Sequence, residues 1–516
     1  MRVARNRLSV DRRDKPIIDR GRAERRPPSE THRNGKDSRD MPEPDLLPHL
    51  GNSGGSVDQL LHGAIVPELL RLALPTVAVL LMTTLLSIVE TYFASSLGTE
   101  VIAGASLVIP VLMLMTMMSN GGIGGGASSA IARARGAGRM VDAESLTYHA
   151  LIIALAFGAM FSVSVIGLGP TLYRGLGGSG AALRQAVIYS NILFGAAVLS
   201  WVAALMQSAL RGAGNVKVPA LIMLASVLVC LMLSPAFIRG WCGLPKLGIA
   251  GAGVAQVICN AGAVLFLIAY MRSAETNLRL RRHPLQRKHF RSILGVGTLS
   301  AIGTLQANLS VTAITATAVL LGTAAIAGYG IASRLEFLLI PILFGFGTAV
   351  VTIVGTNLGA GRIERARRAA LINALMVAAG AEVIGLAVAF FPQAWLGIFT
   401  EDRSVLAVGS NYLHRVGPVY GLIAIAMELY FAGQGARAVG WPLLAGSVRL
   451  IIVATGAGLV LVRHYSLNTA FTLVAIAAAA FGVMTLVAFI LARWSPTPRS
   501  YRHVIIQHSV HIEEAS

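Results

Sequence analysis

The sequence carries little charge for its length. Asp, Glu, Lys and Arg make up 13% of the 516 residues, hydrophobic residues make up 55%, and the mean hydropathy is +0.68. A soluble protein of this length needs far more charge to hydrate its surface. Cysteine is also scarce, because Cys230, Cys242 and Cys259 are the only three. They form neither a disulfide framework nor the paired spacing of a zinc site, and we interpret Cys230 and Cys259 as apolar packing residues.

Nucleotide-binding motifs are lacking as well. No G-x-x-x-x-G-K-[ST] sequence occurs, which argues against an ATP-driven pump. The glycine runs at 120–126 (NGGIGGG) and 175–180 (GLGGSG) do not follow a strand of a βαβ unit. We interpret them as small residues that permit close packing of helices.

Long apolar runs are what the chain has in abundance. A helix needs about 20 apolar residues to cross a bilayer. Such runs recur at 72–95, 101–128, 146–170, 186–209, 219–238, 248–270, 294–320, 325–356, 369–391, 406–432, 442–462 and 468–492. The sequence therefore predicts an all-α integral membrane protein with twelve transmembrane helices.

The remaining segments divide the chain into four predicted parts. Residues 1–60 hold 13 Lys and Arg and 10 Asp and Glu, a composition that cannot bury enough apolar surface to fold, and they lack the apolar core of a signal peptide. We predict a disordered basic tail there. The connection at 271–293 separates two sets of six helices. We expect an N-terminal bundle with its linker at 61–283, a C-terminal bundle at 284–495 and a C-terminal tail at 496–516.

Lys and Arg are distributed unequally between the two sets of loops. With the N-terminus inside, the inner loops and the C-terminal tail carry 20 Lys and Arg, against 6 on the outer side. The positive-inside rule then places both termini in the cytoplasm, and we expect a multi-pass protein of the bacterial cytoplasmic membrane. This bias also accounts for much of the net charge of +19 through attraction to anionic lipid, so we expect no nucleic-acid partner.

The two sets of six helices are copies of one another. LGTEVIAG at 97–104 matches LGTAAIAG at 321–328, and RGAGR at 135–139 matches LGAGR at 358–362. The pairs Pro170 and Pro392, and Tyr189 and Tyr412, keep nearly the same offset. Because each copy has an even number of helices, both cross the membrane in the same direction. Parallel repeats of this kind are typical of secondary transporters with a binding site between the halves.

These segments resemble the multidrug and toxic compound extrusion (MATE) family. The resemblance lies in LALP at 72–75, VETYFASSLGTEVIAGASLVIP at 89–110, GGASSAIARARGAGR at 125–139, RGAGNVKVPA at 211–220, GIAGAGVAQV at 248–257, residues 329–369 and FTEDRSVLAVGSNYL at 399–413. It covers about 60–495 of this sequence. The resemblance implies a V-shaped pair of six-helix bundles that exports organic, often cationic, compounds in exchange for H⁺ or Na⁺. We expect a monomer with no cofactor, no metal site and no enzymatic activity.

Four acidic residues lie well inside predicted spans. A charge at the bilayer centre is costly, so such residues usually face a cavity or a partner. Glu90 stands where the family places its first-helix Asp, 15 residues after Pro75. The resemblance implies that Glu90 binds the coupling cation and that Pro75 lets its helix bend. A carboxyl group that alternates between dry and wet surroundings is also suited to take up and release a proton. The alternative remains open that Glu90 lies at the outer surface of the membrane, close to the end of its helix, without a role in coupling.

The sequence departs from the family around Glu90. Many members have an Asn and, four residues later, an Asp in the fifth helix, and Cys230 and Ser234 stand there instead. Two oxygen ligands for Na⁺ are therefore missing, which favours H⁺ coupling. Gln256, where the family often has a Thr, is a further predicted hydrogen-bond partner of Glu90.

The other three acidic residues lie in the second copy. Glu428 and Arg449 form a candidate site for a cation or a substrate, or else a structural ion pair. Glu336 is two residues from Arg334, on roughly the opposite side of a helix. Glu336 and Glu382 are therefore weaker candidates.

Two other classes of protein remain as alternatives. A flippase for lipid-linked saccharides, from the same superfamily, tends to have an arginine-lined cavity, whereas few arginines lie inside these spans. A membrane-embedded transferase needs a catalytic His or paired carboxylates at a membrane face. The preferred hypothesis is a proton-coupled exporter of organic compounds, with a Na⁺-coupled exporter as the nearest alternative.

Overall fold

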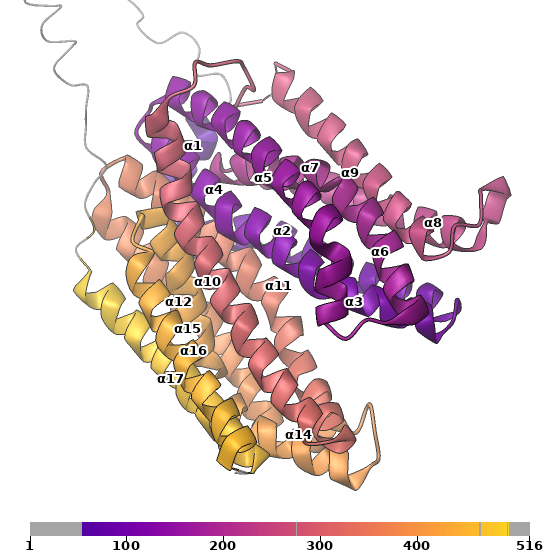
Figure 1. Cartoon of the computed structure of the whole chain (residues 1–516). Coiled ribbons are helices and arrows are strands. Elements are labelled where there is room, and N and C mark those ends of the chain that lie inside the picture. The colour runs from indigo at the N-terminus through magenta and orange to yellow at the C-terminus, as the bar shows by residue number, and fades with distance from the viewer. Residues whose placement is uncertain (1–53, 275, 464–465, 493, 495–516) are drawn as a thin grey trace, which may run out of the picture. The chain divides into compact units, whose positions relative to one another are not determined.

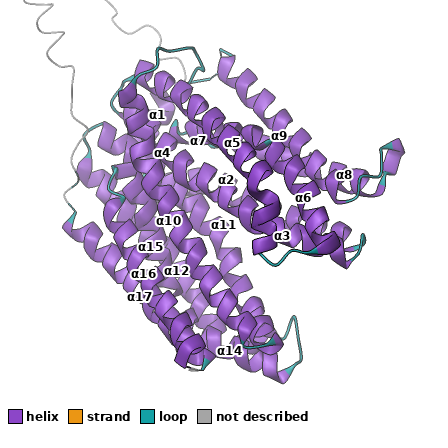
Figure 2. Ribbon diagram, viewed as in Figure 1, coloured by secondary structure: helices purple, strands orange, loops and turns teal. Residues whose placement is uncertain are grey.

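A computed structural model of the protein describes residues 54–274, 276–463, 466–492 and 494. Residues 1–53 of the predicted N-terminal tail (1–60) and the whole predicted C-terminal tail (496–516) lie outside the described residues. Within the described residues every regular element is a helix (Figure 2). The first half of the chain forms α1 (Gly54–His62), α2 (Ile65–Ser95), α3 (Thr99–Met117), α4 (Gly124–Gly136), α5 (Met140–Gly175), α6 (Gly180–Gly195), α7 (Ala197–Gly212), α8 (Lys217–Arg239) and α9 (Ile249–Arg272).

The second half of the chain repeats this pattern of long helices (Figure 1). It forms α10 (Arg287–Leu320), α11 (Thr323–Gly359), α12 (Ile363–Phe390), α13 (Pro392–Leu396), α14 (Arg403–Val416), α15 (Tyr420–Ala436), α16 (Gly440–Arg463) and α17 (Leu467–Leu491). Short helical turns, η1 (Met118–Ile123), η2 (Trp241–Gly243) and η3 (Gly417–Val419), complete the described elements.

The predicted twelve-helix arrangement is confirmed. Among the described residues, ten spans are long and apolar enough to cross a membrane. In this count α3 and α4 together form one span, and so do α14 and α15. Helices α6 and α7, which are bent by 48° relative to each other, together form an eleventh span. The twelfth is α10, whose apolar run is interrupted by Gln306 and Asn308. Both of these polar side chains line a cavity, which explains why the helix contains them.

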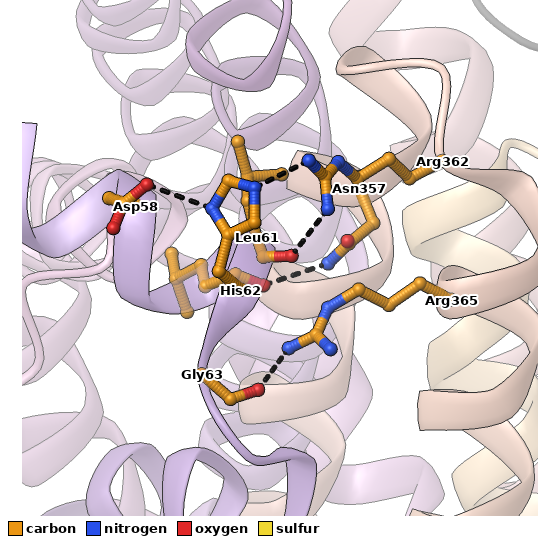
Figure 3. Close-up of polar contacts among 8 residues, drawn as sticks. Asp58, Leu61, His62, Gly63, Asn357, Arg362 and Arg365 are labelled. Carbon is orange, nitrogen blue, oxygen red and sulfur yellow. Dashed lines mark hydrogen bonds and ion pairs between the residues drawn. The ribbon is translucent and has the colours of Figure 1, made fainter.

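The prediction that residues 1–60 are disordered is wrong at its C-terminal end, because helix α1 begins at Gly54. Leu60 is buried, and Asn357 Nδ2 donates a hydrogen bond to the Leu60 carbonyl over 3.1 Å. Arg362 donates to the Leu61 carbonyl over 3.0 Å and lies 2.5 Å from His62 Nε2 (Figure 3). These contacts hold α1 on the turn between α11 and α12. Composition could not reveal this contact because the partner residues lie about 300 positions away.

The two copies share the same backbone turns. Gly98 and Gly322, which precede α3 and α11, have φ values of 111° and 109°, a conformation that side chains rarely adopt. The turns after α4 and α11 also correspond, because Arg139 N donates to the Ala134 carbonyl over 2.9 Å and Arg362 N donates to the Asn357 carbonyl over 2.8 Å. The sequence repeat is therefore a repeat of local structure.

The two halves pack closely at the end of the molecule that carries α1, which we call the α1 end. There α4 packs against α11 and α15. Ser129 Oγ donates to the Gln434 carbonyl over 2.5 Å, and Arg133 Nη1 donates to the Gly435 carbonyl over 2.9 Å. A methyl group on Gly359 would lie 2.2 Å from the Arg133 carbonyl oxygen. In this structure the space between the two halves is therefore closed at the α1 end.

Candidate functional site

Glu90 lies near the C-terminal end of α2 and is half-buried. Two helices of the first half, α6 and α8, place polar groups around its carboxyl. Cys230 of α8 has its Sγ 3.7 Å from Glu90 Oε1, and the fully buried Ser234, one turn later, lies near the carboxyl, although its Oγ makes no hydrogen bond. Tyr189 of α6 lies close enough to interact with the same carboxyl group. The predicted group of Glu90 and Ser234 is therefore assembled by the fold.

Gln256 of α9 is the next member of this group. Its Oε1 lies 3.9 Å from Cys230 Sγ, and its Nε2 lies 3.5 Å from Asn260 Oδ1. Asn260 Nδ2 in turn donates to Ser200 Oγ of α7 over 2.9 Å. Sequence reasoning did not identify Asn260 or Ser200, although the four-residue spacing of Gln256 and Asn260 places them on one helix face. A row of polar side chains thus runs from Glu90 toward α7.

Pro75 lies inside α2, which is helical from Ile65 to Ser95. Proline removes one backbone hydrogen bond from a helix interior and favours a bend. Helix α2 packs against α8 of the first half and against α11 of the second half. A bend at Pro75 would therefore move Glu90 relative to a helix of the other half, and the hinge stays a prediction.

A cavity of about 290 Å³ lies mainly within the second half of the chain. Its lining is mostly apolar and aromatic, with contributions from α10, α11, α15 and α16; the aromatic members are Tyr329, Phe337, Phe344, Tyr420, Tyr430, Phe431 and Phe481. Met117 and Gly121 add a contribution from the first half. A concave apolar site with a few polar groups is the usual form of a small-molecule site.

Glu336 and Arg449 supply the charges of this cavity. Glu336 Oε1 accepts hydrogen bonds from the hydroxyls of Tyr412 and Tyr420, the latter over 3.4 Å. The Arg449 guanidinium interacts with the Glu336 carboxylate and lies 5.6 Å from the centre of the Phe481 ring. Among the described lining residues the acidic and basic side chains therefore balance. Glu336 was the weaker candidate from sequence, yet it is the carboxylate that faces the cavity.

Glu428 and Arg449, predicted together as a candidate site, are not brought together. Glu428 is fully buried, and Asn373 Nδ2 donates to its Oε2 over 2.5 Å, while Oε1 has no hydrogen-bond partner. Its neighbour Met427 lines the cavity instead. Since successive helix residues point about 100° apart, Glu428 faces α12, whereas Arg449 lines the cavity together with Glu336.

Glu382 stabilises the start of a helix. Its Oε2 accepts a hydrogen bond from Gly421 N over 2.7 Å, in the first turn of α15, where backbone N–H groups have no partner within the helix. A carboxylate at a helix N-terminus is also favoured by the helix dipole. Glu382 thus has a structural role in this arrangement.

Comparison with known proteins gives one family. Residues 75–236 and 300–460 match the profile of the MatE family. The "FAD transporter" of Shewanella oneidensis is 26% identical over 376 residues, covering 71% of this chain and 82% of that protein. The "probable multidrug resistance protein NorM" of Thermotoga maritima is 23% identical, covering 78% and 86%. The "multidrug export protein MepA" of Staphylococcus aureus is 24% identical, covering 74% and 85%.

Solved structures show the same fold. A crystal structure described as "MATE in the straight conformation" has a TM-score of 0.75 at 22% identity, covering 84% of this chain and 96% of that one. A structure described as an "outward-facing conformation of a multidrug resistance MATE family transporter" has a TM-score of 0.73 at 23% identity, with the same coverage.

Proposed function

Because this chain belongs to the MatE family and is a membrane transporter, we propose that it exports organic compounds in exchange for protons by alternating access. The observation that supports this most directly is the Glu90 site together with a separate apolar cavity in the second half. One site has the chemistry to carry a proton, and the other has the volume to hold a small molecule.

The neighbours of Glu90 favour a proton over Na⁺. Hard cations bind several oxygen ligands at once. Cys230 Sγ lies 3.7 Å from Glu90 Oε1, and Gln256, predicted as a partner of Glu90, has its Oε1 3.9 Å from the same sulfur instead. A proton needs a single carboxylate oxygen, so this arrangement suits H⁺. Cys230 stands at the fifth-helix position where many family members have an Asn, whose side chain offers an oxygen ligand.

The cavity favours organic substrates of varied shape. Aromatic side chains and Met427 adapt to different apolar surfaces, and Gln306 and Asn308 offer polar contacts. A lipid-linked saccharide is a poorer fit, because Arg449 is the one arginine among the described residues that line the cavity. Since Glu336 balances Arg449, the cavity does not select strongly for one sign of charge.

We assign the α1 end to the cytoplasm. The loops at this end carry most of the Lys and Arg residues between the helices, in agreement with the positive-inside rule. With that assignment, the contacts of Ser129 and Arg133 with α15 close the path to the cytoplasm. Alternating access then requires these contacts to break when the protein opens inward.

The test is transport by purified protein in vesicles with Glu90→Gln. A pH gradient or a Na⁺ gradient is applied separately, and uptake of an organic cation dye is measured. We expect the wild type to respond to the pH gradient alone, and Glu90→Gln to lose this response by about 100-fold or more, as expected for an essential proton-transfer group. Glu100→Gln, an exposed carboxylate at the start of α3, is the matched control. Full proton-driven transport by Glu90→Gln would overturn the coupling site, and transport driven by Na⁺ alone would reverse the choice of ion.

Export of a flavin nucleotide is a second candidate. It is favoured by the similarity to a protein named "FAD transporter" and by Arg449, which offers a cation to a phosphate inside the cavity. The same vesicle assay tests whether a flavin nucleotide is a substrate. FAD added as a competitor would inhibit dye transport only if both compounds enter the cavity.

A further inference from the structure

A second, smaller pocket of about 180 Å³ lies at the α1 end, apart from the Glu90 site and from the second-half cavity. It is bounded by the start of α2, the end of α4, the turn between α7 and α8, and the segment after α9; its lining residues include Arg71, Arg135, Asn215, Lys217, Thr276 and Asn277. All described lining residues belong to the first half of the chain. The pocket is therefore complete without the second half.

Three cations line this pocket, and no carboxylate does so among the described lining residues. Arg71 is paired with Glu68 over 2.6 Å, which leaves Arg135 and Lys217 uncompensated. The Arg135 side chain is only 4% exposed. One of its Nη atoms donates to the Ala213 carbonyl, whereas its Nε has no hydrogen-bond partner. A buried guanidinium with a free donor is costly unless an acceptor arrives.

The N-terminus of α8 lies at the same pocket. Helix α8 begins at Lys217, and its N-cap residue Val216 offers no side-chain hydrogen bond. Asn215 Oδ1 accepts one first-turn N–H, from Val218 over 3.2 Å. Pro219 has no N–H group and Ala220 N donates to the Val216 carbonyl over 3.1 Å, so the N–H of Lys217 is the first-turn donor left for a ligand. This donor and the positive end of the helix dipole favour an anion.

The repeat shows that Arg135 is not required by the fold of its turn. The equivalent residue in the second copy is Leu358, which is 2% exposed. The glycines that follow in the two turns, Gly138 and Gly361, have similar φ values of 73° and 79°. The same backbone therefore forms with leucine at this position, so the arginine has another role.

We propose that this pocket binds the phosphate group of an anionic ligand, either the head group of a phospholipid or a soluble phosphate compound. A guanidinium, an ammonium group and a helix N-terminus together match the charge and geometry of phosphate. The volume accommodates a phosphate with part of its ester, not a large organic substrate. The cytoplasmic face, to which we assign this end, carries anionic head groups.

Thermal unfolding of the full-length protein in nanodiscs tests this proposal. One arm adds inorganic phosphate to nanodiscs of phosphatidylcholine, with sodium chloride of equal ionic strength as the reference. The other arm compares phosphatidylcholine nanodiscs with nanodiscs that also contain phosphatidylglycerol, in a phosphate-free buffer. Because a ligand that binds only the folded protein raises its Tm, we expect a rise in at least one arm.

The variants Arg135→Gln and Lys217→Gln are expected to weaken that response about tenfold or more, since each removes a charge-assisted hydrogen bond. Arg272→Gln is the matched control, because Arg272 is an exposed arginine at the same end that does not line the pocket. If Arg135→Gln does not yield folded protein, the Lys217→Gln variant decides the result, because Lys217 is exposed. A response to phosphate identifies a soluble ligand, and a response to phosphatidylglycerol alone identifies a lipid. No response in the wild type, or an equal response in all four proteins, would show the proposal to be wrong.

Discussion

At the scale of single residues, a carboxylate meets a tyrosine in each half, but from different helices. Glu90 of α2 lies near Tyr189, and Glu336 of α11 accepts a hydrogen bond from Tyr412. Tyr189 and Tyr412 are equivalent in the repeat, whereas the position equivalent to Glu90 is Ile314. The copies kept the tyrosine and placed the acid on different elements. The proposed proton site and the charged residues of the cavity therefore lie on helices that are not equivalent in the repeat.

Arg449 controls the charge of the second-half cavity in our proposal. Arg449→Gln would leave Glu336 without its cation, so an organic cation would gain an attraction of about 1 kcal/mol at an effective dielectric constant typical of proteins. We expect the KM for a cationic dye to fall and that for an anionic dye to rise, measured by dye efflux from cells. Arg415→Gln is the control, because Arg415 bonds to Asn411 and Thr472 and does not line the cavity. Equal changes for both dyes would contradict the prediction.

At the scale of helices, glycine determines how closely the two halves approach. Gly136 of α4 and Gly359 of α11 face each other's helices, and a methyl group on Gly359 would lie 2.2 Å from the Arg133 carbonyl oxygen. Backbone atoms cannot yield as a flexible side chain can. The closed α1 end therefore depends on the absence of a side chain at this contact.

Gly359→Ala is accordingly expected to shift the protein toward a state that is open at the α1 end. Overpacking of this kind costs about 1–3 kcal/mol. The measurement is the distance between spin labels at Val141→Cys and Glu364→Cys, two exposed positions on either side of the contact, in a protein without native cysteines. We expect longer distances to become more populated. Gly167→Ala, in α5 with open space around it, should leave the distribution unchanged, and an unchanged distribution in Gly359→Ala would disprove the prediction.

At the scale of the whole molecule, a histidine cluster links the central connection to α5. Gln286 N donates to His149 Nε2 over 2.8 Å, and the ring of His289, before the predicted span of α10, lies 5.0 Å from the His149 ring. Burial and the neighbouring His149 lower the pKa of His289 from 6.5 to about 4. Lys288 and His283 act in the same direction, and Asp142, 3.8 Å from His289 Nε2, opposes them.

This lowered pKa predicts a loss of stability in acid. Since the folded protein keeps His289 neutral, its contribution is fully present above pH 6.5 and is lost as the pH falls toward about 4. The loss is at most about 3 kcal/mol. Thermal unfolding in detergent between about pH 7 and pH 4 should show a smaller drop in Tm for His289→Gln than for the wild type. His414→Gln, at an exposed histidine, should behave as the wild type, and equal drops in all three would contradict the assignment.

The sequence by itself determined the twelve helices, the repeat and the group around Glu90. Hydropathy acts along each helix, so the lipid-facing runs are visible without knowledge of their neighbours. Glu90 was found because an isolated carboxylate in an apolar run needs a partner, and the family resemblance pointed to Ser234 and Gln256. Cys230, interpreted from sequence as an apolar packing residue, lies 3.7 Å from the carboxylate in the structure.

Only the tertiary structure decided which polar residues meet across the chain. Helix α1 folds because Asn357 and Arg362 contact it from about 300 residues away, and Arg449 faces Glu336 rather than Glu428 because of the rotation of α15. The pocket at Arg135 likewise gathers the ends of helices that are far apart in sequence. Helix rotation and the packing of distant helix ends follow from the sum of many small contacts, so no short stretch of sequence records them.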